Sequence, residues 1–201
     1  FYTFLSLYLR VVLGLSVTET TLLASLSMIA NSVSQTFIWG KISDKYQTRV
    51  GLILIGETTA TFGYILIYFA HIYMLNMYSP FYAAYTIIIG LSLLEFFWSM
   101  SNVGWSALIS DVTASHERSK LMSIISSIGG IGQIVGVSVA GILYDWGGEA
   151  GGFKNGVLFF FASAIMVASA SVLSLAMRST RPKRRKNPTE TREVLSGNNI
   201  K

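Results

Sequence analysis

Two glutamates lie inside long stretches of this sequence that contain no basic residue. Glu57 follows Arg49 by eight residues, and Glu95 lies near the middle of the apolar stretch 81–110. Neither stretch contains a Lys or Arg that could pair with its carboxylate. A buried carboxylate without a cation tends to take up a proton, and acids inside a membrane are candidate functional groups. The two residues therefore predict proton chemistry, most directly at Glu95.

Each glutamate also has a structural interpretation. Glu57 would lie roughly 12 Å into its helix. We expect it to pair with groups on the cytoplasmic side rather than to meet a solute. Glu95 could instead be permanently protonated and only hydrogen-bond a neighbouring helix, and this alternative stays open.

Polar residues recur at helical spacing around Glu95 and in the stretch 20–39. Steps of three and four residues place side chains on one face of a helix. One such face carries Glu95, Trp98, Asn102 and Trp105. A second face would either hydrogen-bond neighbouring helices or form the wall of a water-filled cavity, and it carries Ser27, Asn31, Ser34 and Gln35. We predict a solute or proton pathway lined by Glu95, Trp98, Asn102, Asn31, Gln35 and Gln133.

The composition identifies the environment in which these residues act. The chain has 201 residues, of which 52% are hydrophobic and 12% are charged, and its mean hydropathy is high. Soluble domains carry about 25% charged residues. The sequence therefore predicts an all-α membrane protein. It contains no cysteine, so it offers neither a disulfide framework nor a thiolate site.

Apolar stretches of about twenty residues, long enough to cross a bilayer of about 30 Å, divide the chain. The predicted spans are 20–39, 50–73, 81–110, 122–144 and 156–177. The stretch 1–9 is too short to cross, and we expect it to be the outer end of a truncated first helix. Together these stretches form a transmembrane helical half-domain at 1–177, and 178–201 is a basic cytoplasmic linker or tail.

Local signals predict how some helices begin and pack. Thr18 or Thr20 could cap the second helix after a loop at 10–19, with Glu19 in its first turn. His71 is expected at the outer rim, in an aromatic belt, followed by an outer loop at 72–80. The sequence Gly132-x-x-x-Gly136-x-x-x-Ala140 forms a ridge of small residues that allows two helices to approach closely.

Two charged loops separate predicted spans. The first, 40–49, is expected to be a tight turn at the membrane surface and contains Gly40, Asp44, Lys45 and Arg49. The second contains Asp111, Glu117 and Arg118. Each aspartate ends a predicted helix, where the macrodipole disfavours negative charge. We expect the arginines of these loops to offset that charge.

These loops resemble two loops of the major facilitator superfamily of secondary transporters. Gly40-x-x-x-Asp44-Lys45-x-x-x-Arg49 is similar to the family's loop between helices two and three, although Gln47 stands where glycine is usual and Thr48 where a basic residue is usual. The spacing of Asp111, Glu117 and Arg118 is similar to the loop between helices four and five. The segment 4–16 resembles the end of the family's first helix, which indicates the N-terminal six-helix half.

The resemblance implies secondary active transport of a small solute by alternating access between two six-helix halves. We expect proton coupling, by symport or antiport. The partners would be the solute, protons, the lipid bilayer and a second half, in the same chain or separate. By resemblance, Asp44 also meets a helix of that second half and locks one conformation. A non-transporting membrane interaction protein, or a degenerate half-transporter, is the alternative.

Other functions find no support in the sequence. Lys41 follows Gly40, but no glycine stands upstream at the spacing of a nucleotide-binding loop. No cluster has the spacing of a metal site, and no Ser-His-Asp arrangement is indicated. We therefore expect neither an enzyme nor a cofactor.

The distribution of basic residues predicts the orientation. The loops 41–49 and 112–120 and the C-terminal tail together hold thirteen Lys and Arg residues. The opposite side holds two, Arg10 and Lys154. Basic residues collect on the cytoplasmic side. We expect both loops and the tail in the cytoplasm, no nucleic-acid partner, and the plasma membrane as the location.

Overall fold

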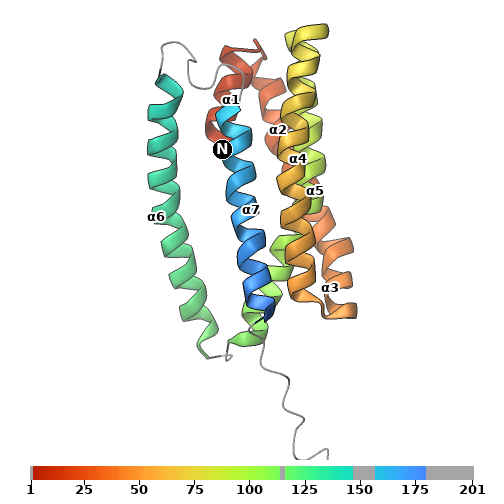
Figure 1. Ribbon diagram of the computed structural model, residues 1–201, viewed down its shortest axis with the longest axis vertical. Helices are drawn as coiled ribbons and strands as arrows, with labels where there is room; N and C mark the ends of the chain where they lie inside the picture. The colour runs from red at the N-terminus through yellow and green to blue at the C-terminus, as the bar shows by residue number, and fades with distance from the viewer. Residues whose placement is uncertain (1, 114–115, 147–156, 180–201) are drawn as a thin grey trace, which may run out of the picture.

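The computed structural model describes residues 2–113, 116–146 and 157–179, and within them every regular element is a helix. Figure 1 shows them as a bundle of long helices that run up and down the molecule. In chain order they are α1 Tyr2–Val11, α2 Val17–Ser34, η1 Gln35–Trp39, α3 Gly40–Tyr46, α4 Arg49–Met77, α5 Pro80–Val112, α6 Arg118–Asp145 and α7 Val157–Ser179. The all-α prediction is confirmed.

Three of these helices are long and apolar enough to cross a membrane, at Arg49–Met77, Pro80–Asp111 and Arg118–Asp145. A shorter apolar helix covers Phe160–Ala176. These elements match four predicted spans to within a few residues. The segment 178–201 falls almost wholly outside the described residues, as does the connection 147–156.

The predicted turn at 40–49 is wrong in extent, because helical backbone continues through most of it. The π-helix η1 leads directly into α3, and the Gly40 N–H donates to the Gln35 carbonyl. A Cβ at position 40 would lie 2.9 Å from that carbonyl oxygen, so only glycine fits here without a shift. The actual turn is confined to Gln47 and Thr48.

The start of α2 also differs from the prediction. Ser16, and not Thr18 or Thr20, is the N-cap, because its backbone is extended while both threonines are already helical. The Ser16 hydroxyl accepts from the Glu19 N–H at 3.2 Å, and the Glu19 carboxylate accepts from the Ser16 N–H at 2.8 Å. This reciprocal pair is a capping box. The hydrogen bonds from the Ser16 side chain and backbone lower the pKa of the Glu19 carboxyl below its ordinary value.

The helices α4 and α5 form the most extensive pair, and glycines from both allow their close approach. A Cβ at Gly56 would lie 2.8 Å from the Ser101 backbone nitrogen. A Cβ at Gly104 would lie 2.9 Å from the Arg49 carbonyl oxygen. Neither position has room for a methyl group unless a helix backbone moves, so the two glycines fix the helix separation.

The small-residue ridge predicted on α6 does not serve this purpose. A Cβ at Gly132 or Gly136 would meet no described atom within 4 Å. The reason is the position of α6, which stands at the left edge of the bundle in Figure 1 with residues 122–139 exposed. Among the described residues, the two glycines of the ridge therefore pack against no neighbouring helix.

His71 is fully buried, so the prediction of an aromatic-belt position is wrong. The cause is that α4 continues to Met77, which places His71 inside the helix pair rather than at its rim. Its Nδ1 lies 3.2 Å from the Ala83 carbonyl oxygen, and its Nε2 lies 2.8 Å from the Tyr8 hydroxyl. A carbonyl only accepts, so Nδ1 carries the hydrogen and Nε2 accepts from Tyr8. His71 thereby joins α1, α4 and α5.

The connections alternate between the two ends of the bundle. The α3 helix, the end of α5, the start of α6 and the end of α7 lie at the lower end in Figure 1. The α1–α2 turn and the start of α5 lie at the upper end. The described residues of the loops 41–49 and 112–120, which carry most of the basic residues before the tail, are therefore on one side of the molecule.

Candidate functional site

A cavity of about 380 Å³ lies between α1, α2 and α5. Its walls combine one carboxylate with neutral polar and small apolar side chains. The lining residues are Tyr2, Ser6, Leu23, Ala24, Ser27, Met28, Asn31, Ser32 and Glu95. Binding sites for small molecules occupy about 300–1,000 Å³. The cavity therefore has room for a small organic solute.

Glu95 is held in the wall of this cavity by two hydrogen bonds from different helices. The Tyr2 hydroxyl lies 2.6 Å from Oε1, and the Asn31 amide donates to Oε2 at 2.8 Å. The Asn31 Oδ1 accepts from the Gln35 amide at 2.5 Å. The side chain of Glu95 is buried, since only 7% of the residue is exposed. One hydrogen-bonded chain thus joins α1, α5, α2 and the start of η1.

The polar stripe on α2 serves both of the purposes that the sequence left open. Ser27 and Asn31 line the cavity. One turn further along, Ser34 is fully buried and its hydroxyl lies 2.6 Å from the Ser99 hydroxyl of α5. The stripe therefore begins as a cavity wall and ends as a hydrogen-bonded contact between two helices.

The predicted polar face of α5 does not line one continuous surface. Trp98 packs against the main apolar core, and Trp105 packs against Val50, Ile53 and Leu108 near the end of the bundle. Asn102 is exposed and lies about 10 Å along the helix from Glu95. The cavity ends before that depth, so Trp98 and Asn102 are not among its lining residues.

Gln133, the remaining residue of the predicted pathway, lies elsewhere. It is exposed on α6, which stands apart from the cavity, and it is not among the lining residues. Of the six predicted pathway residues, the structure brings together Glu95, Asn31 and Gln35.

Glu57 occupies a separate, buried position. It is 5% exposed and does not line the cavity. The Ser101 hydroxyl of α5 donates to its Oε1 at 2.5 Å. The observed partner is therefore a neutral residue of the adjacent helix, whereas we expected groups on the cytoplasmic side. The contact holds α4 against α5 at the same level as the Gly56 close approach.

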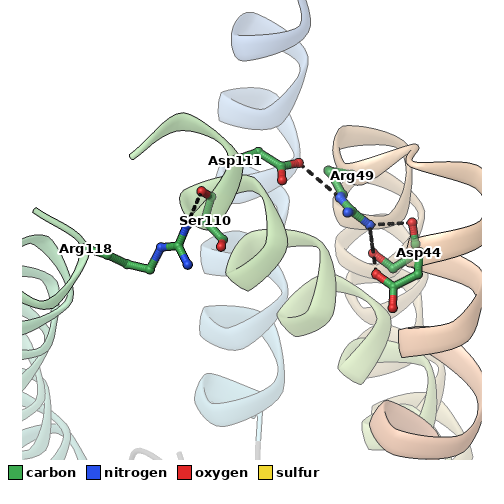
Figure 2. A network of polar contacts seen from close by, with 6 residues as sticks. Asp44, Arg49, Ser110, Asp111 and Arg118 are labelled. Carbon is green, nitrogen blue, oxygen red and sulfur yellow. Dashed lines mark hydrogen bonds and ion pairs between the residues drawn. The ribbon is translucent and has the colours of Figure 1, made fainter. Parts of the chain in front are cut away.

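The first charged loop and the end of α5 meet at a corner of the bundle, shown in Figure 2. The Arg49 guanidinium lies between the two aspartates, 3.7 Å from Asp44 and 3.2 Å from Asp111. It also donates to the Ser43 carbonyl and, at 2.6 Å, to the Ser43 hydroxyl. The Arg49 side chain is 11% exposed, against 84% for Asp44. A largely buried arginine thus ties together α3, α4 and α5.

The other members of the two loops contribute less to this corner. Arg118 donates to the Ser110 carbonyl at 2.9 Å. This hydrogen bond gives a partner to one of the carbonyl groups at the C-terminal end of α5. Lys45 is exposed, with its ammonium 5.2 Å from the Tyr46 ring centroid. Glu117 is exposed and lies 3.8 Å from His116. The structure therefore connects Asp44, Arg49 and Asp111 directly and leaves Lys45 and Glu117 outside that network.

Sequence reasoning missed Tyr2, although it is one of the two partners of Glu95. Tyr2 and Ser6 are four residues apart, and both line the cavity. That spacing places them on one face of α1. This spacing of two polar side chains was the available signal.

A second hollow, of about 770 Å³, lies along α4 and α5. Its lining is almost entirely apolar and includes Phe62, Phe69 and Phe97. It contains no charged residue, so it offers no group for proton chemistry. The described residues also hold no group of three His, Cys, Asp or Glu side chains that could bind a metal ion.

Comparison with known proteins gives one match. The sequence model of the Major Facilitator Superfamily matches residues 1–199. No curated protein and no solved structure matches the chain.

Proposed function

Because the chain belongs to the major facilitator superfamily, a family of membrane transporters and not of enzymes, we propose that it moves a small solute across the membrane by alternating access, coupled to protons at Glu95. Family membership makes it an integral membrane protein that acts on a transported solute within the lipid bilayer. The solute, the coupling and the residues involved belong to the proposal.

The observation that carries the proposal is the hydrogen bonding of Glu95 in the cavity. The Asn31 amide is held as a donor to Oε2, because its oxygen accepts from Gln35. The Tyr2 hydroxyl can donate to Oε1 when Glu95 is ionised, or accept from it when Glu95 is protonated. The site therefore accommodates both protonation states without moving a helix.

The burial of Glu95 links its protonation to the opening and closing of the cavity. An ionised carboxylate is costly in a closed, dry site, because no water solvates the charge. No Lys or Arg lines this cavity to offset that cost. Glu95 would therefore release its proton when the cavity is open to water and would favour closure when protonated.

The corner around Arg49 is proposed to control which conformation the transporter adopts. Arg49 binds one aspartate at the end of α3 and another at the end of α5. Asp44 remains mostly exposed, so its carboxylate is available to a further partner. By family resemblance, that partner is a helix of a second six-helix half, in the same chain or separate. We infer that the contact locks one conformation.

The proposed half-domain is 1–177, with 178–201 as a basic linker or tail. We infer a plasma-membrane location with the loops 41–49 and 112–120 in the cytoplasm, because basic residues collect on that side. A tag at Gln47 that reacts with a reagent added outside the cell would contradict this orientation.

The experiment compares two carboxylates in proteoliposomes that contain this chain and the second half. A panel of radiolabelled sugars, amino acids and amines is offered under an imposed pH gradient. We expect at least one solute to accumulate with the wild-type protein. Glu95→Gln should fold but lose gradient-driven accumulation, because the amide cannot exchange a proton.

Glu57→Gln is the matched control. A glutamine at this position keeps a carbonyl oxygen that can accept from Ser101. Its gradient-driven accumulation should equal that of the wild-type protein. If Glu95→Gln accumulates solute as well as Glu57→Gln does, proton coupling lies elsewhere. If no solute accumulates with any variant, the transport proposal fails in favour of an interaction protein.

A further inference from the structure

The cavity around Glu95 is lined by one acidic residue and by no basic residue. Glu95 is the single charged residue among its nine lining residues. The other polar groups are three serine hydroxyls, one tyrosine hydroxyl and one carboxamide, all neutral. A solute in this cavity would therefore meet one negative charge and no positive charge from the lining residues.

We propose that the transported solute is a small organic cation, an amine or a quaternary ammonium compound, whose charged group pairs with Glu95. This inference rests on the proposed function, and it adds the chemical class of the solute. It also makes the cation and the proton competitors for one carboxylate.

The carboxylate retains the capacity to bind such a group. A carboxylate has about four acceptor positions on its two oxygens. The protein uses one position on each oxygen, for Tyr2 and for Asn31. A cation can approach the remaining positions from the cavity side, while the two existing hydrogen bonds keep the carboxylate oriented.

The need to neutralise the carboxylate when the cavity closes favours a cation over other solutes. Either a proton or a monovalent cation would neutralise Glu95, which lowers the cost of closing the cavity around it. An anionic solute would instead place two negative charges together in a poorly solvated site. An uncharged solute would leave the carboxylate either unpaired or protonated, and would have no direct competition with the proton.

The apolar part of the lining suits the organic portion of the solute. Leu23, Ala24 and Met28 form this part of the wall. The Tyr2 ring lies beside Glu95, and aromatic faces attract quaternary ammonium groups. A volume of about 380 Å³ accepts a small amine.

The titratable groups that face Glu95 from neighbouring helices are tyrosines, which stay neutral near neutral pH. Tyr2 of α1 is hydrogen-bonded to it, Asn31 of α2 is uncharged, and Tyr64 of α4 is within electrostatic range. Tyrosine ionises near pH 10. Among the described residues that face this carboxylate, the proton and the cation would therefore compete at Glu95 itself.

The test measures binding by calorimetry, with the purified protein in lipid nanodiscs. The probes are choline and dimethylbutanol, in which carbon replaces the ammonium nitrogen of choline without changing its shape. We expect choline to bind at least about tenfold more tightly than dimethylbutanol at about pH 8. Choline should also bind more weakly as the pH is lowered, because protons compete with it for the same carboxylate.

Two variants test whether the preference for choline depends on the charge of Glu95 or on a general effect of removing a buried carboxylate. Glu95→Gln should lose the preference for choline while Glu57→Gln keeps it. Tetramethylammonium and a primary amine, ethanolamine, extend the test to other cations. The inference is overturned if dimethylbutanol binds as tightly as choline, if Glu95→Gln keeps the preference, or if none of the three cations binds. A different result would overturn this inference but support the proposed function. In that case the pH gradient would drive accumulation of an uncharged solute, and Glu95→Gln would lose this accumulation.

Discussion

Replacing Gly104 by alanine tests whether a glycine fixes the separation of α4 and α5. The added Cβ would lie 2.7 Å from Ile53 Cγ1, 2.9 Å from the Arg49 carbonyl oxygen and 3.1 Å from the Ile53 nitrogen. Carbon atoms in contact are normally about 3.5–4.0 Å apart. Ile53 is 1% exposed, so its side chain has no open space into which to turn. Two of the three atoms are backbone, so α4 itself must shift.

The expected free-energy changes follow from these contacts. Overpacking a well-packed core costs about 1–3 kcal/mol, and alanine returns up to about 1 kcal/mol of helix propensity. Gly104→Ala should therefore destabilise the protein by roughly 1–2 kcal/mol. Gly130→Ala is the matched control, because a Cβ at that position on α6 meets nothing within 4 Å. It should stabilise the protein by about 0.5–1 kcal/mol.

Thermal unfolding of both variants in the same detergent measures the difference. A change of 1 kcal/mol shifts Tm by about 2–4 °C in a chain of this size. Gly104→Ala should lower Tm by roughly 2–8 °C, whereas Gly130→Ala should raise it slightly. A Gly104→Ala protein as stable as the wild type would refute the close approach of the two helices.

Three further predictions concern the helix ends. Gln47 adopts φ 51°, in the left-handed region, so Gln47→Gly should stabilise the protein by up to about 1 kcal/mol in chemical unfolding, and Gln47→Ala should not. The lowered pKa of Glu19 means that its capping contribution is present above its ordinary value of 4.5 and is lost as pH falls through the lower folded value. Hydrogen exchange, corrected for intrinsic rates, should then show the first turn of α2 opening in acid, and Glu19→Gln should remove this pH dependence. Asp44→Asn should insert normally but slow transport in the assembled protein, and wild-type transport rates would rule out a gating role.

The sequence predicts well those features that depend on one residue in an unusual environment. Glu95 stood out because a charge in an apolar stretch is costly wherever the helix packs. Asp44 and Asp111 stood out because each lies near the end of a helix, where a positive partner is favourable. The structure then shows that Arg49 contacts both aspartates.

The sequence predicts less well the features that depend on which helices meet. Tyr2 was missed because its role arises from α5, ninety-three positions away along the chain. The Gly132–Gly136 ridge shows that α6 could approach a neighbour, but the pattern does not specify one. Gly104 has no such pattern around it, yet its Cβ position is occupied by α4. Spacing describes a single helix face, whereas packing depends on the partner.

The central claim, that the cavity beside Glu95 is part of a pathway open to each side in turn, can be tested by thiol labelling. The chain has no cysteine, so single-cysteine variants need no background changes. Ser32 lines the cavity, and Val33 is an exposed neighbour that does not. In membranes containing the assembled protein, Ser32→Cys should react with a membrane-impermeant maleimide added from either side, while Val33→Cys should react from neither. Labelling of Ser32→Cys from one side only, under both directions of the pH gradient, would contradict the account.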